Sequence, residues 1–153
     1  MSTNTEGKTP FEHLFQIGVV VKDMDKAIER LKVLGLGPFT PKTPPPDAKE
    51  MFRGKPFVPA ERVLIKATQM GNVELELIQP LGGASPHQEY LDRKGEGIQH
   101  LAFAVDDLES EVDKLTQKGA ITLLRSDKKY GGRVAYLDLD VGGIIVELVK
   151  RQM

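Results

Sequence analysis

The feature that most constrains how this chain folds is an internal repeat in its sequence. Residues 16–36 read QIGVVVKDMDKAIERLKVLGL, and residues 100–120 read HLAFAVDDLESEVDKLTQKGA. The two stretches align without a gap at an offset of 84 residues (100 − 16), so that Gly35 corresponds to Gly119. Each stretch has the pattern of an apolar strand, an acidic helix start, an amphipathic helix and a glycine stop. We therefore expect one strand–helix unit to occur twice.

A second pair of segments repeats in the same order. Residues 62–78 read RVLIKATQMGNVELELI and residues 133–149 read RVAYLDLDVGGIIVELV, without a gap, at an offset of 71 residues (133 − 62). This alignment pairs Glu76 with Glu147. Each segment predicts two strands turned at or near a glycine. Because both alignments are gapless and follow the same order, chance similarity is the weaker explanation.

Shorter elements are predicted between the repeated segments. A short extra strand is expected in each copy, at residues 50–54 and 121–125. Residues 36–60 hold seven of the ten prolines, so this segment is expected to be a loop that carries at most an edge strand. Ser85 and the proline after it have the pattern of an N-cap and a first helical residue, which predicts a short helix at about 86–94.

The repeat and the chain length together predict one α+β domain. A chain of 153 residues is large enough to bury a core of its own. We expect a single domain at 11–153, with a first βαβββ module at about 12–80 and a second at about 97–150. The short helix at about 86–94 joins the two modules.

Composition excludes several classes of protein. Charged residues make up 28% of the chain and the net charge is −1, so no cationic face is expected for binding nucleic acid or a membrane surface. The chain has no cysteine, which excludes disulfides, thiolate nucleophiles and cysteine metal ligands. The polar first ten residues lack the apolar core of a signal peptide, and a cytoplasmic location is the expectation.

The alternation of side chains along each predicted strand separates a bulky face from a face with polar residues. In the first strand of each module the less bulky face begins with a polar residue, Gln16 in one copy and His100 in the other. In the last strand, Glu147 interrupts a run that is apolar on both faces, so its carboxylate is expected to be buried. A buried carboxylate is costly unless it is paired or bound to a cation.

Four residues are equivalent in pairs through the repeat: Gln16 with His100, and Glu76 with Glu147. If a pseudo-twofold axis relates the two modules, all four side chains can converge on it. One imidazole, one amide oxygen and two carboxylates suit an octahedral divalent ion with two positions open for water or substrate. Taken singly, each of these residues is more often an ordinary polar residue of a strand; taken together, they predict a metal site.

Two segments carry a resemblance to a known family. Residues 73–109, VELELIQPLGGASPHQEYLDRKGEGIQHLAFAVDDLE, look like the linker and fifth strand of the methylmalonyl-CoA epimerase branch of the vicinal oxygen chelate superfamily. Residues 142–149, GGIIVELV, look like the last strand of that branch. The chain from about Glu12 to Val149 resembles this superfamily (glyoxalase/bleomycin resistance/dioxygenase), which also includes glyoxalase I and the extradiol dioxygenases.

This resemblance implies a fold and a chemistry. It implies paired βαβββ modules that form a cup-shaped, barrel-like mixed sheet, often as a homodimer, around one divalent metal: zinc, cobalt, nickel or manganese. The implied ligand positions fall on Gln16, Glu76, His100 and Glu147, the four residues that the repeat selects. The implied enzyme is a metal-dependent isomerase or lyase that moves a proton at the carbon next to a carbonyl, with Glu147 as the base.

The sequence departs from the epimerase branch at two positions. That branch usually has histidine at the first-strand ligand position, where this chain has Gln16. The branch also carries a catalytic glutamate in a Val-Pro-Glu motif, but here the motif reads VPAERV with Ala60 at the glutamate position. Glu61 follows directly and is the candidate second catalytic carboxylate if the loop shifts.

Alternative functions stay open at this point. Gln16 is similar to the glutamine of some glyoxalase I enzymes, which favours a lactoylglutathione lyase acting on a thiol adduct rather than an epimerase acting on an acyl thioester. An iron dioxygenase is disfavoured, because that chemistry uses two histidines and one carboxylate. A metal-free protein that binds a small molecule, like the resistance members of the superfamily, is the non-enzymatic alternative. In one interpretation, the proline-rich segment 36–60 lies over the cup and determines substrate choice. In the other, it is a passive surface loop.

Overall fold

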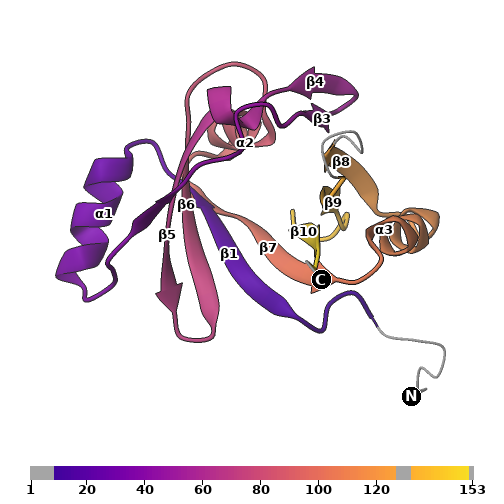
Figure 1. Ribbon diagram of the computed structural model, residues 1–153, viewed down its shortest axis with the longest axis horizontal. Coiled ribbons are helices and arrows are strands. Elements are labelled where there is room, and N and C mark those ends of the chain that lie inside the picture. Colours follow the sequence, from indigo (N-terminus) through magenta and orange to yellow (C-terminus); the bar gives the residue numbers. More distant parts are fainter. Residues whose placement is uncertain (1–8, 127–131, 152–153) are drawn as a thin grey trace.

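The computed structural model describes residues 9–126 and 132–151. Within these residues, ten strands form one sheet that curls into a half-barrel, with helices α1 and α3 on its outside (Figure 1). The elements in chain order are β1 (Leu14–Val20), α1 (Met24–Val33), β2 (Thr40–Lys42), β3 (Glu50–Phe52), β4 (Lys55–Phe57), the 3-10 helix η1 (Pro59–Glu61), β5 (Val63–Met70), β6 (Val73–Pro80), α2 (Pro86–Lys94), β7 (Gly97–Val105), α3 (Leu108–Gln117), β8 (Ile121–Ser126), β9 (Val134–Asp138) and β10 (Ile145–Lys150).

The strand order confirms the predicted α+β fold of two βαβββ modules. The order in the sheet is β2-β5-β6-β1-β7-β10-β9-β8-β3-β4. β1 and β7 lie antiparallel at the junction between the modules. β6 runs parallel to β1, and β10 runs parallel to β7. Each is followed outward by an antiparallel partner, β5 or β9. The sheet therefore has the same local arrangement on both sides of the junction, as a pseudo-twofold axis requires.

The proline-rich segment 36–60 is more structured than predicted. It contains three short strands and a 3-10 helix rather than at most one edge strand. β2 pairs with β5 and is the outer strand of the first module. The predicted extra strand at 50–54 forms as β3, but the β3–β4 hairpin pairs with β8 of the second module. β2 and β4 are the two edges of the sheet, where Pro41 and Pro56 are tolerated although proline cannot donate to a strand ladder.

The two long helices begin at equivalent aspartates of the repeat. The side chain of Asp23 accepts a hydrogen bond from the backbone N–H of Lys26, and Asp107 accepts one from Ser110, at 3.1 and 3.0 Å. Such N-caps satisfy backbone donors that the first helical turn leaves open, and each stabilises a helix by about 1 kcal/mol. The capping residues therefore fix where α1 and α3 begin on the outer face of the sheet.

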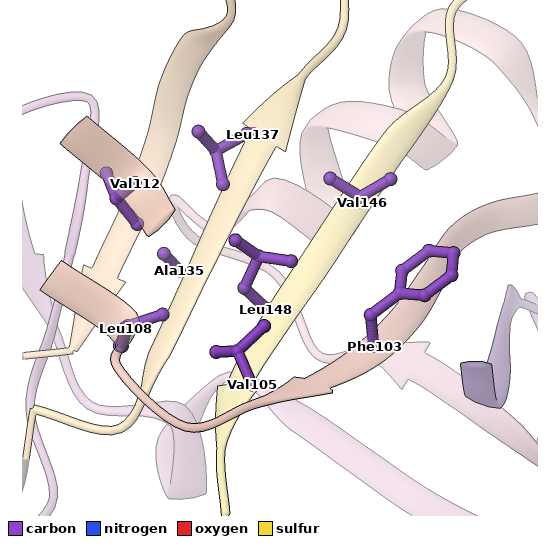
Figure 2. Packing of buried hydrophobic residues seen from close by; sticks show 8 residues of the cluster. All are labelled: Phe103, Val105, Leu108, Val112, Ala135, Leu137, Val146 and Leu148. Carbon is purple, nitrogen blue, oxygen red and sulfur yellow. The ribbon is translucent and has the colours of Figure 1, made fainter. Parts of the chain in front are cut away.

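The bulky faces of the strands pack under these helices, as the alternation of side chains predicts. Figure 2 shows the packing in the second module, where residues of α3 lie against β7, β9 and β10. A matching cluster in the first module joins α1 to β1 and β6. The buried residues of the second-module cluster are Phe103, Val105, Leu108, Val112, Ala135, Leu137, Val146 and Leu148. Because the helices cover this face, the opposite face of each strand is left to line the inside of the half-barrel.

Helix α2 joins the two modules at the position predicted from the sequence. The hydroxyl of Ser85 accepts a hydrogen bond from the backbone N–H of Gln88 at 3.0 Å, and Pro86 is the first helical residue. Pro86 and His87 are buried, so the first turn of α2 packs into the molecule. No helix in the described part of the chain is long and apolar enough to span a membrane.

Candidate functional site

The sheet register brings the four predicted ligands to one face. Gln16 pairs with Ala102 of β7, and Ala102 pairs with Glu147 of β10. Two residues further along β1, Gly18 pairs with both His100 and Glu76. Side chains of directly paired residues lie on the same face of a sheet. All four side chains therefore project from the inner face of the half-barrel, away from α1 and α3.

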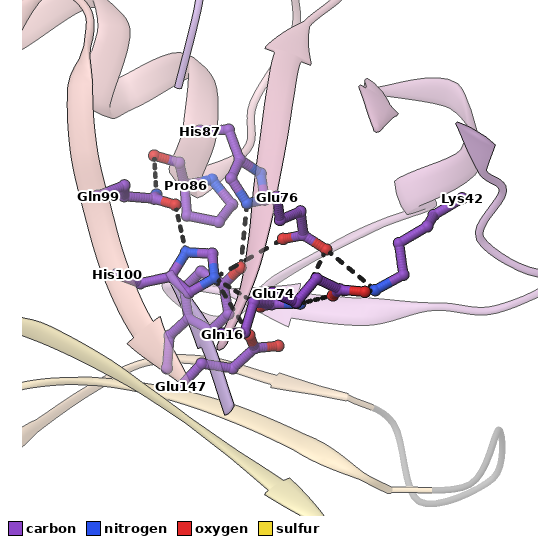
Figure 3. Close-up of polar contacts among 10 residues, drawn as sticks. Gln16, Lys42, Glu74, Glu76, Pro86, His87, Gln99, His100 and Glu147 are labelled. Carbon is purple, nitrogen blue, oxygen red and sulfur yellow. Dashed lines mark hydrogen bonds and ion pairs between the residues drawn. The ribbon is translucent and has the colours of Figure 1, made fainter. Parts of the chain in front are cut away.

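The four side chains meet at Nε2 of the His100 imidazole (Figure 3). The side-chain oxygen Oε1 of Gln16 lies 3.2 Å from this nitrogen, and Oε1 of Glu147 also lies at 3.2 Å. Oε1 of Glu76 is 3.7 Å away. The His100 side chain is fully buried, whereas the Glu76 and Glu147 side chains are 11% and 13% exposed. The structure thus brings together the four residues that the repeat selects, with one edge of the cluster open to solvent.

A neighbouring glutamine fixes the orientation of the His100 ring. Nδ1 of His100 lies 2.9 Å from the side-chain oxygen of Gln99. The amide nitrogen of Gln99 donates to the carbonyl oxygen of Pro86 at 3.2 Å, so the amide oxygen is the atom that faces the imidazole. Nδ1 therefore carries the proton and donates it to Gln99, while Nε2 points at the other three side chains. This is the arrangement in which an imidazole uses Nε2 as a ligand.

Burial and like charge dominate the electrostatics of the cluster. Burial raises the pKa of Glu76 to about 7, and the nearby Glu147 carboxylate raises it as well, against the lowering effects of His100 and Lys42. Burial lowers the pKa of His100, but Glu147 and Glu76 outweigh it, and the pKa is raised. The two carboxylates, Glu147 and Glu76, therefore favour a positive charge at the position of the His100 imidazole.

Lys42 of β2 adds a cation beside the cluster. Its ammonium group donates to Glu74 at 2.6 Å and lies 3.7 Å from Oε2 of Glu76. The amide nitrogen of Gln16 also donates to Glu74, at 2.9 Å, and to Glu76, at 3.2 Å. These contacts hold the amide so that its oxygen faces His100 (Figure 3). The proline-rich segment therefore contributes directly to the surroundings of the site.

The donor set fits a divalent metal ion. Counted by histidine, cysteine, aspartate and glutamate alone, the described residues hold no group of three arranged for a metal. With the amide oxygen of Gln16 included, three oxygens surround Nε2 of His100 at 3.2–3.7 Å. Neighbouring donors around an ion bound at about 2.1 Å lie about 3 Å apart, so a small contraction of the cluster would bring its four donors to ligand distances. A cation there would also offset the repulsion that raises the pKa of Glu76.

The structure does not bring Glu61 to this cluster. Glu61 is exposed at the end of η1, and no hydrogen bond or ion pair joins it to the four residues. Its neighbour Ala60 leaves no carboxylate at the position that the resemblance implies. The role of Glu61 as a second catalytic carboxylate stays a prediction without support from its position.

Two buried residues beside the site were missed by the sequence interpretation. His87 was not among the predicted site residues, but it is buried in α2 with Nε2 3.1 Å from the Tyr136 hydroxyl. The Tyr136 ring lies 5.1 Å from the His100 ring. Burial, and then Glu147, raise the pKa of Tyr136 well above its ordinary value, so its hydroxyl keeps its proton while it pairs with His87. The apolar strand around Tyr136 was the available signal, because a buried hydroxyl needs a partner.

Comparison with known proteins places these features in a family context. The model of the Glyoxalase/Bleomycin resistance protein/Dioxygenase superfamily matches residues 15–136. The uncharacterized protein YqjC of Bacillus subtilis (strain 168) is 29% identical over 134 residues, which cover 80% of this chain and 93% of that protein. Mitochondrial methylmalonyl-CoA epimerase of Bos taurus is 34% identical over 101 residues, which cover 62% of this chain and 57% of that enzyme. The match to the bovine enzyme thus spans little more than half of its length.

A solved structure has the same fold. Methylmalonyl-CoA epimerase in complex with methylmalonyl-CoA and NH4+ aligns with a TM-score of 0.66 at 22% sequence identity, covering 90% of this chain and 93% of that chain. At this identity the likeness shows a shared fold. Homologues and structural neighbours of the chain thus include methylmalonyl-CoA epimerases.

Proposed function

The chain belongs to the Glyoxalase/Bleomycin resistance protein/Dioxygenase superfamily, and we propose that it is a divalent-metal-dependent epimerase of a 2-substituted acyl thioester. The observation that carries the proposal is the convergence of three side-chain oxygens on Nε2 of His100, with a partly exposed carboxylate, Glu147, among them. The epimerase homologues support the same reaction class.

The residues have separate tasks in this reaction. Gln16, Glu76, His100 and Glu147 would hold the metal, which would polarise the substrate carbonyl and stabilise negative charge on its oxygen. Glu147, through its exposed edge, takes the proton from the carbon next to the carbonyl. The C–H electron pair then forms the carbon–carbon double bond of an enolate. Return of a proton to the opposite face of this planar carbon gives the epimer.

The surroundings of the cluster favour this proton transfer. His100 is fully buried and its ring is held by Gln99, so the imidazole does not compete as a mobile acid or base. Tyr136 and His87 bond to each other, and both side chains are buried in the inner wall. Glu147 remains the carboxylate of the cluster with the most exposed side chain, at 13%.

A glyoxalase-I-like lyase is the second candidate, and Gln16 is the specific observation that favours it. The amide oxygen of Gln16 faces His100, which is the orientation a ligand oxygen needs. A lyase of this kind moves a proton between neighbouring carbons of a thiol–ketoaldehyde adduct, so it uses the same metal and base. The two functions therefore differ in substrate rather than in the parts of the site.

Metal analysis followed by two assays tests the proposal. The protein is purified without chelator and without an affinity metal, and its metal content is measured per chain. It is then assayed, as isolated and after addition of cobalt, nickel, zinc or manganese, for epimerisation of methylmalonyl-CoA and for isomerisation of the glutathione–methylglyoxal adduct.

The outcomes separate the candidates. About one divalent ion per chain with epimerisation supports the proposal. Activity only on the glutathione adduct supports the lyase. A protein that binds none of the four metals and acts on neither substrate contradicts both, and leaves a small-molecule-binding protein.

A further inference from the structure

Inversion at a carbon next to a carbonyl needs proton transfer on two opposite faces. A carboxylate that removes the proton from one face cannot deliver it to the other without moving around the substrate. A second acid–base group must therefore face the same space from another direction. Glu61 is exposed outside the cluster, and Ala60 carries no titratable group, so neither supplies it.

Glu50 of β3 lies on the inner face of the half-barrel. The register runs from Glu147 to Tyr136 of β9, from Tyr136 to Leu124 of β8, and from Leu124 to Phe52 of β3. Paired residues share a face, and residues two apart on one strand share a face. Glu50 stands two residues before Phe52 and so projects from the same face as Glu147, from a strand three places further along the curled sheet.

The surroundings of the Glu50 side chain indicate a catalytic rather than a structural role. Its side chain is partly buried, and it makes no hydrogen bond or ion pair with the part of the chain that the structure describes. Burial raises its pKa to about 7, and the Glu147 carboxylate adds to this shift. An unpaired, partly buried carboxyl is costly to folding, and such groups concentrate at functional sites.

We propose that Glu50 is the second acid–base residue of the site, working opposite Glu147. This inference rests on the proposed epimerase function. In one direction, Glu147 takes the proton from the carbon, the enolate forms, and the protonated Glu50 carboxyl donates its proton to the other face as the carbonyl reforms. In the reverse direction the two residues exchange roles. No electrons are gained or lost, and between turnovers in the same direction Glu147 releases its proton to solvent while Glu50 takes one up from solvent.

The pairing of the β3–β4 hairpin with the second module determines where Glu50 lies. The hairpin pairs with β8, which puts Glu50 on the same half of the sheet as Glu147 and Tyr136. Burial raises the pKa of Tyr136 most, and Glu147, Glu76 and Glu50 add to the shift, so Glu147 and Glu50 both lie within electrostatic range of this hydroxyl. The proline-rich segment would thus supply the acid–base group that Ala60 does not.

The test compares Glu50→Gln with Glu29→Gln, at an exposed glutamate of the outer helix α1, as the matched control, using each enantiomer of methylmalonyl-CoA in deuterated water. Inversion and hydrogen–deuterium exchange at carbon 2 are measured separately, with metal content and melting temperature for each variant. We expect Glu50→Gln to slow inversion by at least about 100-fold. It should still exchange the carbon-2 hydrogen of one enantiomer, the one whose hydrogen faces Glu147, and not that of the other. Glu29→Gln should invert like the wild type.

Each other outcome overturns a defined statement. Wild-type inversion by Glu50→Gln overturns the assignment of Glu50. Loss of exchange for both enantiomers together with loss of metal also overturns it, because Glu50 would then act on the structure of the site. A wild-type protein that neither inverts nor exchanges either enantiomer in the presence of metal overturns the epimerase function, and the inference with it.

Discussion

The imidazole of His100 lies over Gly18 on the neighbouring strand. The two residues pair in the β1–β7 register, and a Cβ built on Gly18 would overlap ring atoms Cε1, Nε2 and Nδ1 of His100. The glycine is needed here for space, because its φ angle is not in the left-handed region that favours glycine. The absence of a side chain at residue 18 therefore sets the position of the nitrogen at which the other three side chains meet.

Gly18→Ala is expected to displace the ring and weaken metal binding. The new methyl group would push His100 away from Gln16 and Glu147, and overpacking of this kind costs about 1–3 kcal/mol of stability. Calorimetric titration with cobalt should give an affinity lower by at least about 10-fold, the smallest effect usual for disturbed ligand positioning. Urea unfolding checks that the variant still folds. Wild-type cobalt affinity in a folded Gly18→Ala protein would contradict the role given to this glycine.

Glu76 and Glu74 offer a matched pair of carboxylates on one strand. Both accept hydrogen bonds from the amide of Gln16, but only Glu76 reaches the His100 imidazole. Glu76→Gln is therefore expected to lower cobalt affinity by about 100-fold, and Glu74→Gln by less than about 10-fold. The visible absorption of bound cobalt during titration measures both. Equal losses in the two variants would mean that negative charge near the site, rather than ligation by Glu76, determines binding.

Gln99 is expected to act on the metal through His100. Gln99→Met keeps the side-chain volume but removes the oxygen that accepts the Nδ1 proton. Loss of such a partner typically lowers metal affinity by about 10–100-fold. Gln69→Met, at an exposed glutamine on β5, is the control and should bind cobalt like the wild type. Unchanged affinity in Gln99→Met would show that the imidazole is held in place without this hydrogen bond.

The internal repeat predicted the two strand–helix units because it consists of local sequence patterns. Each strand–helix unit carries its own alternation of side chains, its capping aspartate and its glycine stop, and the structure forms both units as expected. The sheet has the same strand order on both sides of the β1–β7 junction. Residues that are equivalent in the repeat, Gln16 with His100 and Glu76 with Glu147, therefore occupy equivalent positions in the sheet.

What the sequence did not predict depends on contacts between distant segments. The β3–β4 hairpin pairs with β8, more than 60 residues away in the chain, and nothing in a proline-rich run specifies that partner. The burial of His87 depends likewise on Tyr136 of a distant strand. Turn and strand propensities are local, whereas these placements are decided by which inner face remains to be covered. For that reason Glu50 was not among the predicted site residues.

Glu50 should make the protein less stable at alkaline pH. Its pKa is raised from 4.5 to about 7 in the folded protein. The folded state therefore holds this proton more tightly than the unfolded state, and the stability gained from it is full below about pH 4.5 and lost as the pH rises through 7. The unfolding free energy of Glu50→Gln minus that of the wild type should be roughly 2–3 kcal/mol larger at pH 8 than at pH 4.5.

Urea unfolding of both proteins at the two pH values measures this gain. Glu61→Gln is the control, because its side chain is exposed, and it should differ from the wild type by less than about 0.5 kcal/mol at either pH. A Glu50→Gln variant with the same stability difference at both pH values would show that water or an ion already stabilises the ionised carboxylate.

His87 should give the opposite pH dependence on the acid side. Burial, and then the charge of His100, lower the pKa of His87 to about 3. The unfolded chain takes up this proton below about pH 6.5 but the folded protein does not, so stability falls as the pH drops from 6.5 toward 3. His87→Gln removes the titrating ring and keeps a hydrogen-bonding partner for the Tyr136 hydroxyl. The variant should lose packing stability at pH 7.5, and this deficit should shrink by roughly 2–3 kcal/mol at pH 4.5. His13→Gln, at an exposed position, is the control, and a His87→Gln deficit that is equal at the two pH values would mean that the buried ring is protonated in the folded protein.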